Sequence, residues 1–121
     1  MSLRSEGVRV LVVEDESAVA MLIEAFLADL GCETSASAGC VAEALDAVAK
    51  GGFEVALLDF NLAGERVIPV AEALAERGVP FGFLTGYGAA ALPPPFDGHP
   101  VLAKPFLFSN FAYFVQSLTA R

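Results

Sequence analysis

Five positions in this sequence carry side chains that could bind a divalent cation and accept a phosphoryl group, and each lies at the end of an apolar stretch. They are Glu14 and Asp15, Asp59, Thr85 and Lys104. Carboxylates that are held close together repel one another, and a divalent cation that prefers oxygen ligands, Mg²⁺ or Mn²⁺, offsets that repulsion. A carboxylate can also attack phosphorus as a nucleophile, while a metal and a lysine ammonium neutralise charge on the transferring group.

The elements that would carry these positions alternate between short apolar strands and longer helices. Strands are expected at residues 8–13, 33–37, 53–58, 81–84 and 100–103, and helices at residues 18–30, 41–49, 67–77 and 107–118. Nearly continuous apolar runs indicate strands that are buried on both faces of a parallel sheet. Ser17 is the expected N-cap of the first helix, and a polar loop is expected after Asp59.

This alternation predicts an α/β fold with right-handed crossovers and helices on both sides of a parallel sheet. Ligand sites in such sheets form at the carboxyl ends of the strands, so the polar positions should converge at one edge. Each position also has a simpler explanation. Glu14 and Asp15 could compensate a helix dipole, Asp59 and Thr85 could be turn residues, and Lys104 could be a solvated loop residue. Their order after successive strand ends favours a shared site.

With these positions in this order, the chain from Val8 to about Leu118 resembles the receiver domains of bacterial response regulators, the CheY-like superfamily. The resemblance rests on residues 12–16 (VVEDE), 57–62 (LLDFNL), 84–86 (LTG) and 104–106 (KPF). It implies a doubly wound, five-stranded parallel sheet of the flavodoxin-like type with strand order 2-1-3-4-5. It also implies a switch in a two-component system or phosphorelay, which signals through contacts with other proteins.

The resemblance assigns a role to each site position. Asp59 would accept phosphate from a histidine kinase or a histidine phosphotransfer protein, and the domain would catalyse only its own phosphorylation and dephosphorylation. The expected Mg²⁺ (or Mn²⁺) ligands are Asp15, Asp59, the backbone carbonyl of Asn61 and, directly or through water, Glu14. Thr85 and Lys104 would hold the phosphoryl group, and Gly86 would keep its approach open.

A narrower resemblance involves residues 80–87, whose sequence is PFGFLTGY. This stretch is similar to that of the stand-alone receivers known as the FATGUY group, although Leu84 replaces their usual alanine. Members of that group have no output domain, and some act in stress-response phosphorelays. A chain cut from a longer hybrid kinase or regulator would look the same in sequence.

Two features depart from the general receiver pattern. The position three residues before Lys104, where most receivers have an aromatic switch residue, is Val101, and Tyr87 is an aromatic residue that either replaces it or simply packs. The fourth helix is expected to be short or irregular because three prolines follow Leu92. We therefore predict a mobile or order-switching segment between Gly86 and Gly98.

The last helix carries more apolar residues than one buried face requires. Phe108, Phe111, Val115 and Leu118 form a stripe at helical spacing that predicts the core-facing side. Three further residues fall off that stripe, namely Leu107, Tyr113 and Phe114. Exposed apolar residues of this kind indicate a partner surface, for a homodimer or a docking kinase, unless the proline-rich loop covers them.

Length and composition are consistent with one domain, with residues 1–7 as a tail and residues 8–121 as the receiver domain. The 121 residues are 55% hydrophobic, and with a net charge of −8 they have no basic cluster for nucleic acid. No apolar run could span a membrane and no signal peptide is evident, so a cytoplasmic location is expected. Cys32 and Cys40 are expected to be packing residues, and His99 a loop residue.

Three other functions deserve comparison. A small Mg²⁺-dependent phosphohydrolase of the haloacid-dehalogenase type would use the same aspartyl-phosphate chemistry, but its second aspartate is replaced here by Asn61. A dinucleotide-binding fold would need a glycine-rich turn after the first strand, where this chain has acidic residues. A partner-binding module that no longer uses phosphate remains an alternative because of Val101 and the interrupted fourth helix.

Overall fold

A computed structural model describes residues 7–62, 64–86, 92 and 96–119. Its centre is a parallel sheet of five strands in the order β2-β1-β3-β6-β7, which confirms the predicted doubly wound topology. The strands are β1 (Arg9–Val13), β2 (Glu33–Ala38), β3 (Val55–Asp59), β6 (Phe81–Thr85) and β7 (Val101–Ala103).

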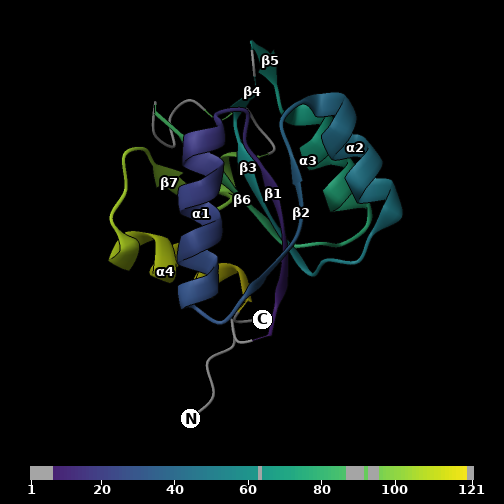
Figure 1. The fold of residues 1–121 in the computed structure, drawn as a ribbon. Helices are drawn as coiled ribbons and strands as arrows, with labels where there is room; N and C mark the ends of the chain where they lie inside the picture. The colour runs from purple at the N-terminus through teal and green to yellow at the C-terminus, as the bar shows by residue number, and fades with distance from the viewer. Residues whose placement is uncertain (1–6, 63, 87–91, 93–95, 120–121) are drawn as a thin grey trace.

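Helices cover both faces of this sheet. They are α1 (Ser17–Asp29), α2 (Val41–Lys50), α3 (Ile68–Glu76) and α4 (Phe108–Thr119). Figure 1 shows α1 and α4 on one side of the sheet and α2 and α3 on the other. The four expected helices are therefore confirmed within one or two residues at each end.

The sequence of the central strands explains why both faces are buried. Successive side chains of a strand point to opposite faces. In β1, Val10 and Val12 accordingly pack toward α1 and α4, whereas Leu11 and Val13 belong to the core under α2 and α3. Every residue of β3 and β6 is buried, as expected for central strands of a doubly wound sheet.

Two local expectations were wrong. The N-cap of α1 is Glu16 rather than Ser17, and its side chain makes no capping hydrogen bond. The stretch after Asp59 is a small antiparallel hairpin rather than an irregular loop, with strands β4 (Asn61–Leu62) and β5 (Glu65–Arg66). The Arg66 guanidinium lies 5.7 Å from the centre of the Phe60 ring, a cation–π contact that holds the hairpin against the domain.

The predicted surface of the last helix needs correction at Phe114. This side chain is buried, at 4% exposure, and it packs with Phe111, Val115 and Leu118. The reason is Gly82 in β6, where an added Cβ would lie 2.6 Å from the Phe114 ring. The missing side chain makes room for the ring, so the buried stripe of α4 is wider than helical spacing predicted.

Phe108, which the same spacing placed in the core, is exposed, so that prediction was wrong. Its ring contacts Phe26 of α1 edge to face at 5.1 Å between ring centres. Leu107 and Tyr113 are exposed as predicted. Of the three residues expected at the surface, two are therefore correctly placed and Phe114 is not.

The region expected to lack a regular fourth helix is described only in part. Tyr87 and most of the segment from Gly86 to Gly98, which was predicted to be mobile, lie outside the described residues. The described part includes a 3-10 turn, η2 (Phe96–Gly98), and both Leu92 and Phe96 are buried. His99 follows this turn as a loop residue, as predicted, and stacks on Phe81 with 4.3 Å between ring centres.

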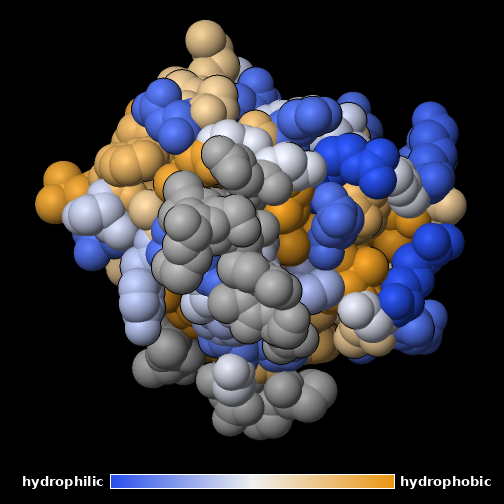
Figure 2. Space-filling model, turned by 90° about the horizontal axis from the view of Figure 1, so that it is seen from below, coloured by the Kyte–Doolittle hydropathy of each residue, from blue (hydrophilic) through white to orange (hydrophobic). Residues whose placement is uncertain are grey.

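Residues 1–6 of the expected tail also lie outside the described part of the chain. Among the described helices, none combines the length and apolar character that would be needed to cross a membrane. At the end of the molecule where the strands begin, hydrophilic and hydrophobic residues are intermixed, as Figure 2 shows.

Candidate functional site

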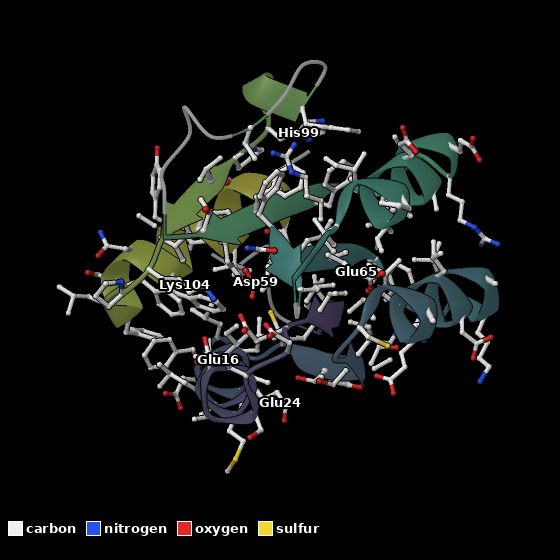
Figure 3. All side chains as sticks on the ribbon, turned by 90° about the horizontal axis from the view of Figure 1, so that it is seen from above. Glu16, Glu24, Asp59, Glu65, His99 and Lys104 are labelled. Carbon is white, nitrogen blue, oxygen red and sulfur yellow. The ribbon has the colours of Figure 1, made fainter. Side chains whose placement is uncertain are left out.

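The carboxyl ends of four strands bring the predicted site residues together. Asp59 and Thr85 are the last residues of β3 and β6, while Glu14 and Lys104 directly follow β1 and β7. Next to them is a hollow of about 350 Å³, here called the strand-end hollow, which is lined by Asp15, Glu16, Asp59, Asn61, Thr85, Gly86 and Lys104. Seen from above in Figure 3, Lys104 and Asp59 lie next to each other, near Glu16.

Backbone hydrogen bonds fix the loops that carry these side chains. The amide of Phe60 donates to the carbonyl of Leu84 at 2.9 Å, which ties the chain after Asp59 to β6. The amide of Lys104 donates to the carbonyl of Thr85 at 3.0 Å, which ties the chain after β7 to the same strand. The spacing between the Asp59 carboxylate, the Thr85 hydroxyl and the Lys104 ammonium is therefore set by the sheet itself.

Three carboxylates form a cluster at the hollow. Glu14, Asp15 and Asp59 each offer a carboxylate oxygen within 4.8 Å of the others. Glu14 and Asp59 are buried, whereas Asp15 is exposed. Such close carboxylates repel one another, and oxygen-only ligands at this spacing suit a hard divalent cation. The donor set therefore fits Mg²⁺ by its chemistry.

Lys104 partly neutralises this cluster. Its ammonium lies 3.1 Å from Glu14 Oε1 and 3.3 Å from Asp59 Oδ2, and its side chain is 19% exposed. Burial alone lowers the pKa of Lys104, but the Asp59 and Glu14 carboxylates more than reverse this effect and raise its pKa above the usual value. The lysine therefore stays charged at neutral pH.

The surroundings of Asp59 change its ionisation. Burial raises the pKa of Asp59, and the charge of Glu14 raises it further, to about 7, although Lys104 acts in the opposite direction. The amide of Asn61 donates to Asp59 Oδ1 at 3.4 Å, a long bond that opposes these effects only weakly. A carboxylate in this position costs free energy unless further positive charge is supplied.

Some features of the site were not predicted. Glu16 lines the hollow although it was considered only as part of a motif, and Asn61 is held at the start of the unexpected hairpin. Gly86 does line the hollow, and an added Cβ there would meet nothing within 4 Å. Val101 lies in β7 beside Phe83 rather than at the hollow.

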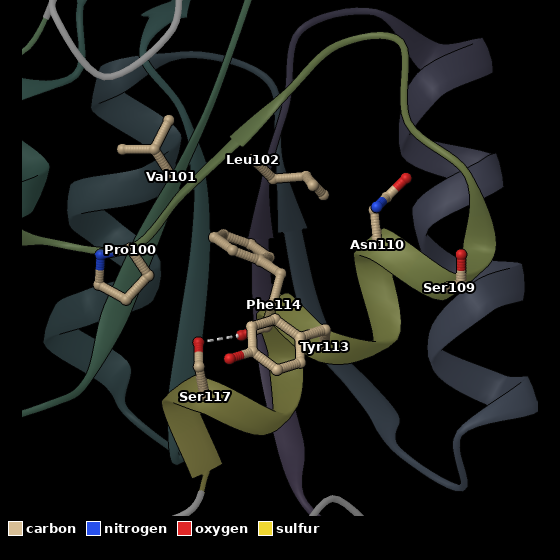
Figure 4. Close-up of a pocket in the computed structure, with 8 residues that line it drawn as sticks. All are labelled: Pro100, Val101, Leu102, Ser109, Asn110, Tyr113, Phe114 and Ser117. Atoms are coloured by element: carbon tan, nitrogen blue, oxygen red, sulfur yellow. Dashed lines mark hydrogen bonds between the residues drawn. The ribbon is translucent and has the colours of Figure 1, made fainter.

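The residues suggested as a partner surface do not form one patch at the hollow. Tyr113 is 77% exposed and lines a groove of about 460 Å³ between α4 and β7, to which the buried Phe114 contributes one wall (Figure 4). Leu107 is exposed at the start of α4 and is not among the residues that line this groove. The groove and the strand-end hollow share no lining residues.

The topology and the strand-end site together match the response regulator receiver domain, whose family model aligns with residues 10–95. The chain belongs to this family, and the resemblance noted in the sequence is confirmed. The family is one of signalling domains rather than conventional enzymes.

Solved structures extend the comparison. The chain is 41% identical to SdrG from Sphingomonas melonis Fr1, with a TM-score of 0.83 and 98% of both chains covered. It is 40% identical to the BeF3-activated conformation of SdrG from Pseudomonas melonis Fr1, with a TM-score of 0.81 and coverage of 98% and 99%. PhyR from Brucella abortus is 26% identical with a TM-score of 0.83, and the match covers 97% of this chain but 50% of PhyR. A comparison with curated protein sequences gave no significant match.

Proposed function

We propose that this protein is a phosphoryl-accepting switch in which Asp59 is the acceptor. The observation that carries the proposal is the position of Asp59, a buried carboxylate at a strand end, 3.3 Å from the Lys104 ammonium. It faces a hollow that Thr85 also lines, so an incoming phosphoryl group would meet a nucleophile, a hydroxyl and a cation together. The beryllofluoride-activated state of SdrG, at 40% identity, supports this reading.

Mg²⁺ would be held by the carboxylates of Asp15 and Asp59 and by the backbone carbonyl of Asn61, next to the charge of Glu14. When bound, such an ion supplies positive charge that offsets the negative charge of the carboxylates and of the phosphoryl oxygens. Mn²⁺ prefers the same ligands and would serve in its place.

Three side chains have separate roles in the transfer of the phosphoryl group. One Asp59 carboxylate oxygen attacks phosphorus, so that an O–P bond forms while the P–N bond to the donor histidine breaks and the histidine nitrogen keeps the electron pair. Lys104 stabilises negative charge on the phosphoryl oxygens, and the Thr85 hydroxyl donates a hydrogen bond to one of them. Water later attacks the same phosphorus, the O–P bond to Asp59 breaks, and inorganic phosphate leaves while Asp59 returns to a free carboxylate.

The phosphoryl donor in this proposal is a histidine kinase or a histidine phosphotransfer protein, and the output is a contact with another protein. The similarity of residues 80–87 to the FATGUY group makes a receiver of that type part of the proposal. A relative 28% identical to this chain, of which the match covers 46%, is described as the PhyR stress response regulator, which makes a stress-response phosphorelay a reasonable setting.

The direct test is intact-protein mass spectrometry after incubation with acetyl phosphate, with and without Mg²⁺. We expect a Mg²⁺-dependent gain of one phosphoryl group that is absent from the Asp59→Asn variant. Because some receivers do not react with small donors, beryllofluoride binding, followed by NMR, serves as the second arm. Failure of both arms would overturn the proposal in favour of a module that binds partners without phosphate.

A further inference from the structure

A second cavity lies at the opposite end of the sheet from the strand-end hollow, where β6 and β7 begin. It has a volume of about 220 Å³ and is here called the amino-end cavity. Its walls come from the end of α3, the start of β6, the segment before β7 and the end of α4. No aspartate, glutamate, lysine or arginine lines it, and it shares no lining residue with the strand-end hollow.

The edge of β6 that faces β7 is paired along only part of its length. Peptide groups of alternate residues in a strand point to the same neighbouring strand, and here the Phe83 amide donates to the Pro100 carbonyl at 2.9 Å. Phe81 has the same orientation as Phe83, but it lies before the first pair of this ladder, Phe83 with Val101. The N–H and C=O of Phe81 therefore point past the start of β7, where Phe81 forms part of the cavity wall.

Neither peptide group of Phe81 has a partner in β7. Continuing the ladder by two residues, the Phe81 carbonyl would accept from residue 100, but Pro100 has no N–H. The Phe81 amide would donate to the carbonyl of Gly98, and the hydrogen bonds among the described residues do not include this one. Phe81 is buried, at 2% exposure. Buried peptide groups without partners are costly, so these two indicate a bound molecule that supplies them.

The remaining walls add one more acceptor and several flat apolar surfaces. The Ser117 hydroxyl donates to a carbonyl within its own helix at 2.7 Å, so its oxygen can only accept a further hydrogen bond. Pro80 and Pro100 contribute their apolar rings. The His99 ring stacks on the Phe81 ring with 4.3 Å between ring centres, which holds both rings in place. The cavity thus offers one peptide donor, one peptide acceptor and one hydroxyl acceptor between apolar walls.

We propose that the amino-end cavity binds a small, flat, uncharged molecule with a cyclic amide or urea group, of the kind found in uracil. The C=O of such a group accepts from the Phe81 amide and its adjacent N–H donates to the Phe81 carbonyl, so that one edge of the ligand satisfies both. A urea has a second N–H, for which the Ser117 oxygen is an acceptor.

The size and charge of the cavity limit the ligand further. Drug-sized ligands usually occupy about 300–1,000 Å³, so this cavity suits a smaller molecule. Without a basic side chain in its lining, it offers a phosphate group no charge-assisted hydrogen bond, which favours the uncharged base over a nucleotide. The site is separate from the proposed phosphoryl transfer and does not depend on it.

The first experiment titrates metal-free, unphosphorylated protein with uracil and follows the backbone amides by ¹⁵N NMR. The matched control ligand is 1,3-dimethyluracil, which keeps the ring and both carbonyls but has no N–H. We expect a saturable shift of the Phe81 amide signal with uracil, with a Kd of roughly 1 mM for so small a ligand. The control should bind about 10-fold more weakly, because it leaves the Phe81 carbonyl unpaired. No saturable shift, or equal affinity for both ligands, would overturn the proposal.

The second experiment repeats the uracil titration on variants of the cavity. Pro100→Ala supplies an N–H opposite the Phe81 carbonyl and should weaken uracil binding by roughly 5-fold or more. Its matched control is Pro69→Ala, at the exposed start of α3, which should leave the affinity unchanged. Ala75→Leu adds bulk at the cavity wall and should also weaken binding, which keeps the test valid if Pro100→Ala perturbs the fold.

The outcomes separate a ligand site from a hydrated gap. Unchanged uracil affinity in both Pro100→Ala and Ala75→Leu would overturn the proposal and leave ordered water as the partner of Phe81. Uridine 5′-monophosphate should bind more weakly than uracil, and tighter binding would refute the assignment of an uncharged ligand. Because Mg²⁺ and phosphoryl donors are absent from these titrations, their result is independent of whether Asp59 accepts phosphate.

Discussion

Replacing Asp59 by asparagine should stabilise the metal-free protein, because this carboxylate experiences more repulsion than attraction. With an effective dielectric constant of about 20, the repulsion from Glu14, at no more than 4.8 Å, costs at least about 3.5 kcal/mol, and the ion pair with Lys104 at 3.3 Å contributes about 5 kcal/mol. Burial adds the largest cost, so that the pKa of Asp59 rises from 3.8 to about 7, which corresponds to roughly 4 kcal/mol against the ionised form. The amide also removes the cost of burying a charge.

The expected gain for Asp59→Asn is about 1–3 kcal/mol in the free energy of unfolding, which corresponds to roughly 3–10 °C in Tm for a domain of this size. The assay is thermal and urea unfolding in a buffer that contains EDTA. Asp46→Asn is the matched control, since this residue loses one charge in an exposed pair with Lys50 and should change stability by less than about 0.5 kcal/mol. A destabilised Asp59→Asn protein would refute the reasoning.

The pH dependence gives an independent check on the same carboxyl group. The pKa of Asp59 rises from 3.8 to about 7 on folding, so between these values the native state binds a proton that the unfolded state has lost. The contribution of Asp59 to stability is therefore complete below pH 3.8 and is lost as the pH rises through about 7. The stability difference between Asp59→Asn and the wild type should grow over this window, and Mg²⁺ should reduce it by binding the folded wild type. A difference that does not vary with pH would contradict the assignment.

Three further substitutions test the packing and charge of the fold, all by urea unfolding. Lys104→Met should lower the free energy of unfolding of the metal-free protein by roughly 2 kcal/mol, because two carboxylates lose a partly buried cation; no loss would mean that the pairs are too hydrated to matter. Gly82→Ala should cost about 1–3 kcal/mol through the clash with the Phe114 ring, whereas Gly98→Ala, with open space, should be nearly neutral. Phe114→Ala should cost about 3–5 kcal/mol, and Tyr113→Ala, at an exposed position, less than about 1 kcal/mol; equal costs would contradict the observed burial.

The strand-end site was predictable because its geometry follows from topology alone. Parallel strands in a doubly wound sheet place their carboxyl ends at one edge, so residues as distant in sequence as Glu14 and Lys104 could be brought together without knowing any side-chain contact. The same argument could not say that Lys104 pairs with Glu14 and Asp59. That pairing depends on burial and on the Glu16 amide, which are properties of the folded loop.

Two predictions from the sequence were wrong for different reasons, a contact with a distant strand and a pair of very short strands. Phe114 was assigned to the surface from the period of its own helix, but its burial depends on Gly82, which lies in a different strand. The β4–β5 hairpin was missed because each of its strands has two residues, too few for a periodic pattern. Its place depends instead on the burial of Leu62 in the core, on the hydrogen bond from the Val67 amide to the Phe60 carbonyl, and on the contact between Arg66 and Phe60.

Val101 stands where most receivers have an aromatic residue, and the packing around it fits a smaller side chain. Side chains in β6 alternate between faces, so Phe81, Phe83 and Thr85 project to the same side of the sheet. Val101 packs against the core cluster on that side, next to Phe83 in the neighbouring strand. The volume that a large aromatic ring at position 101 would need lies beside this cluster, which already contains Phe96. A small residue at position 101 is therefore consistent with a face whose aromatic rings come from β6 and η2.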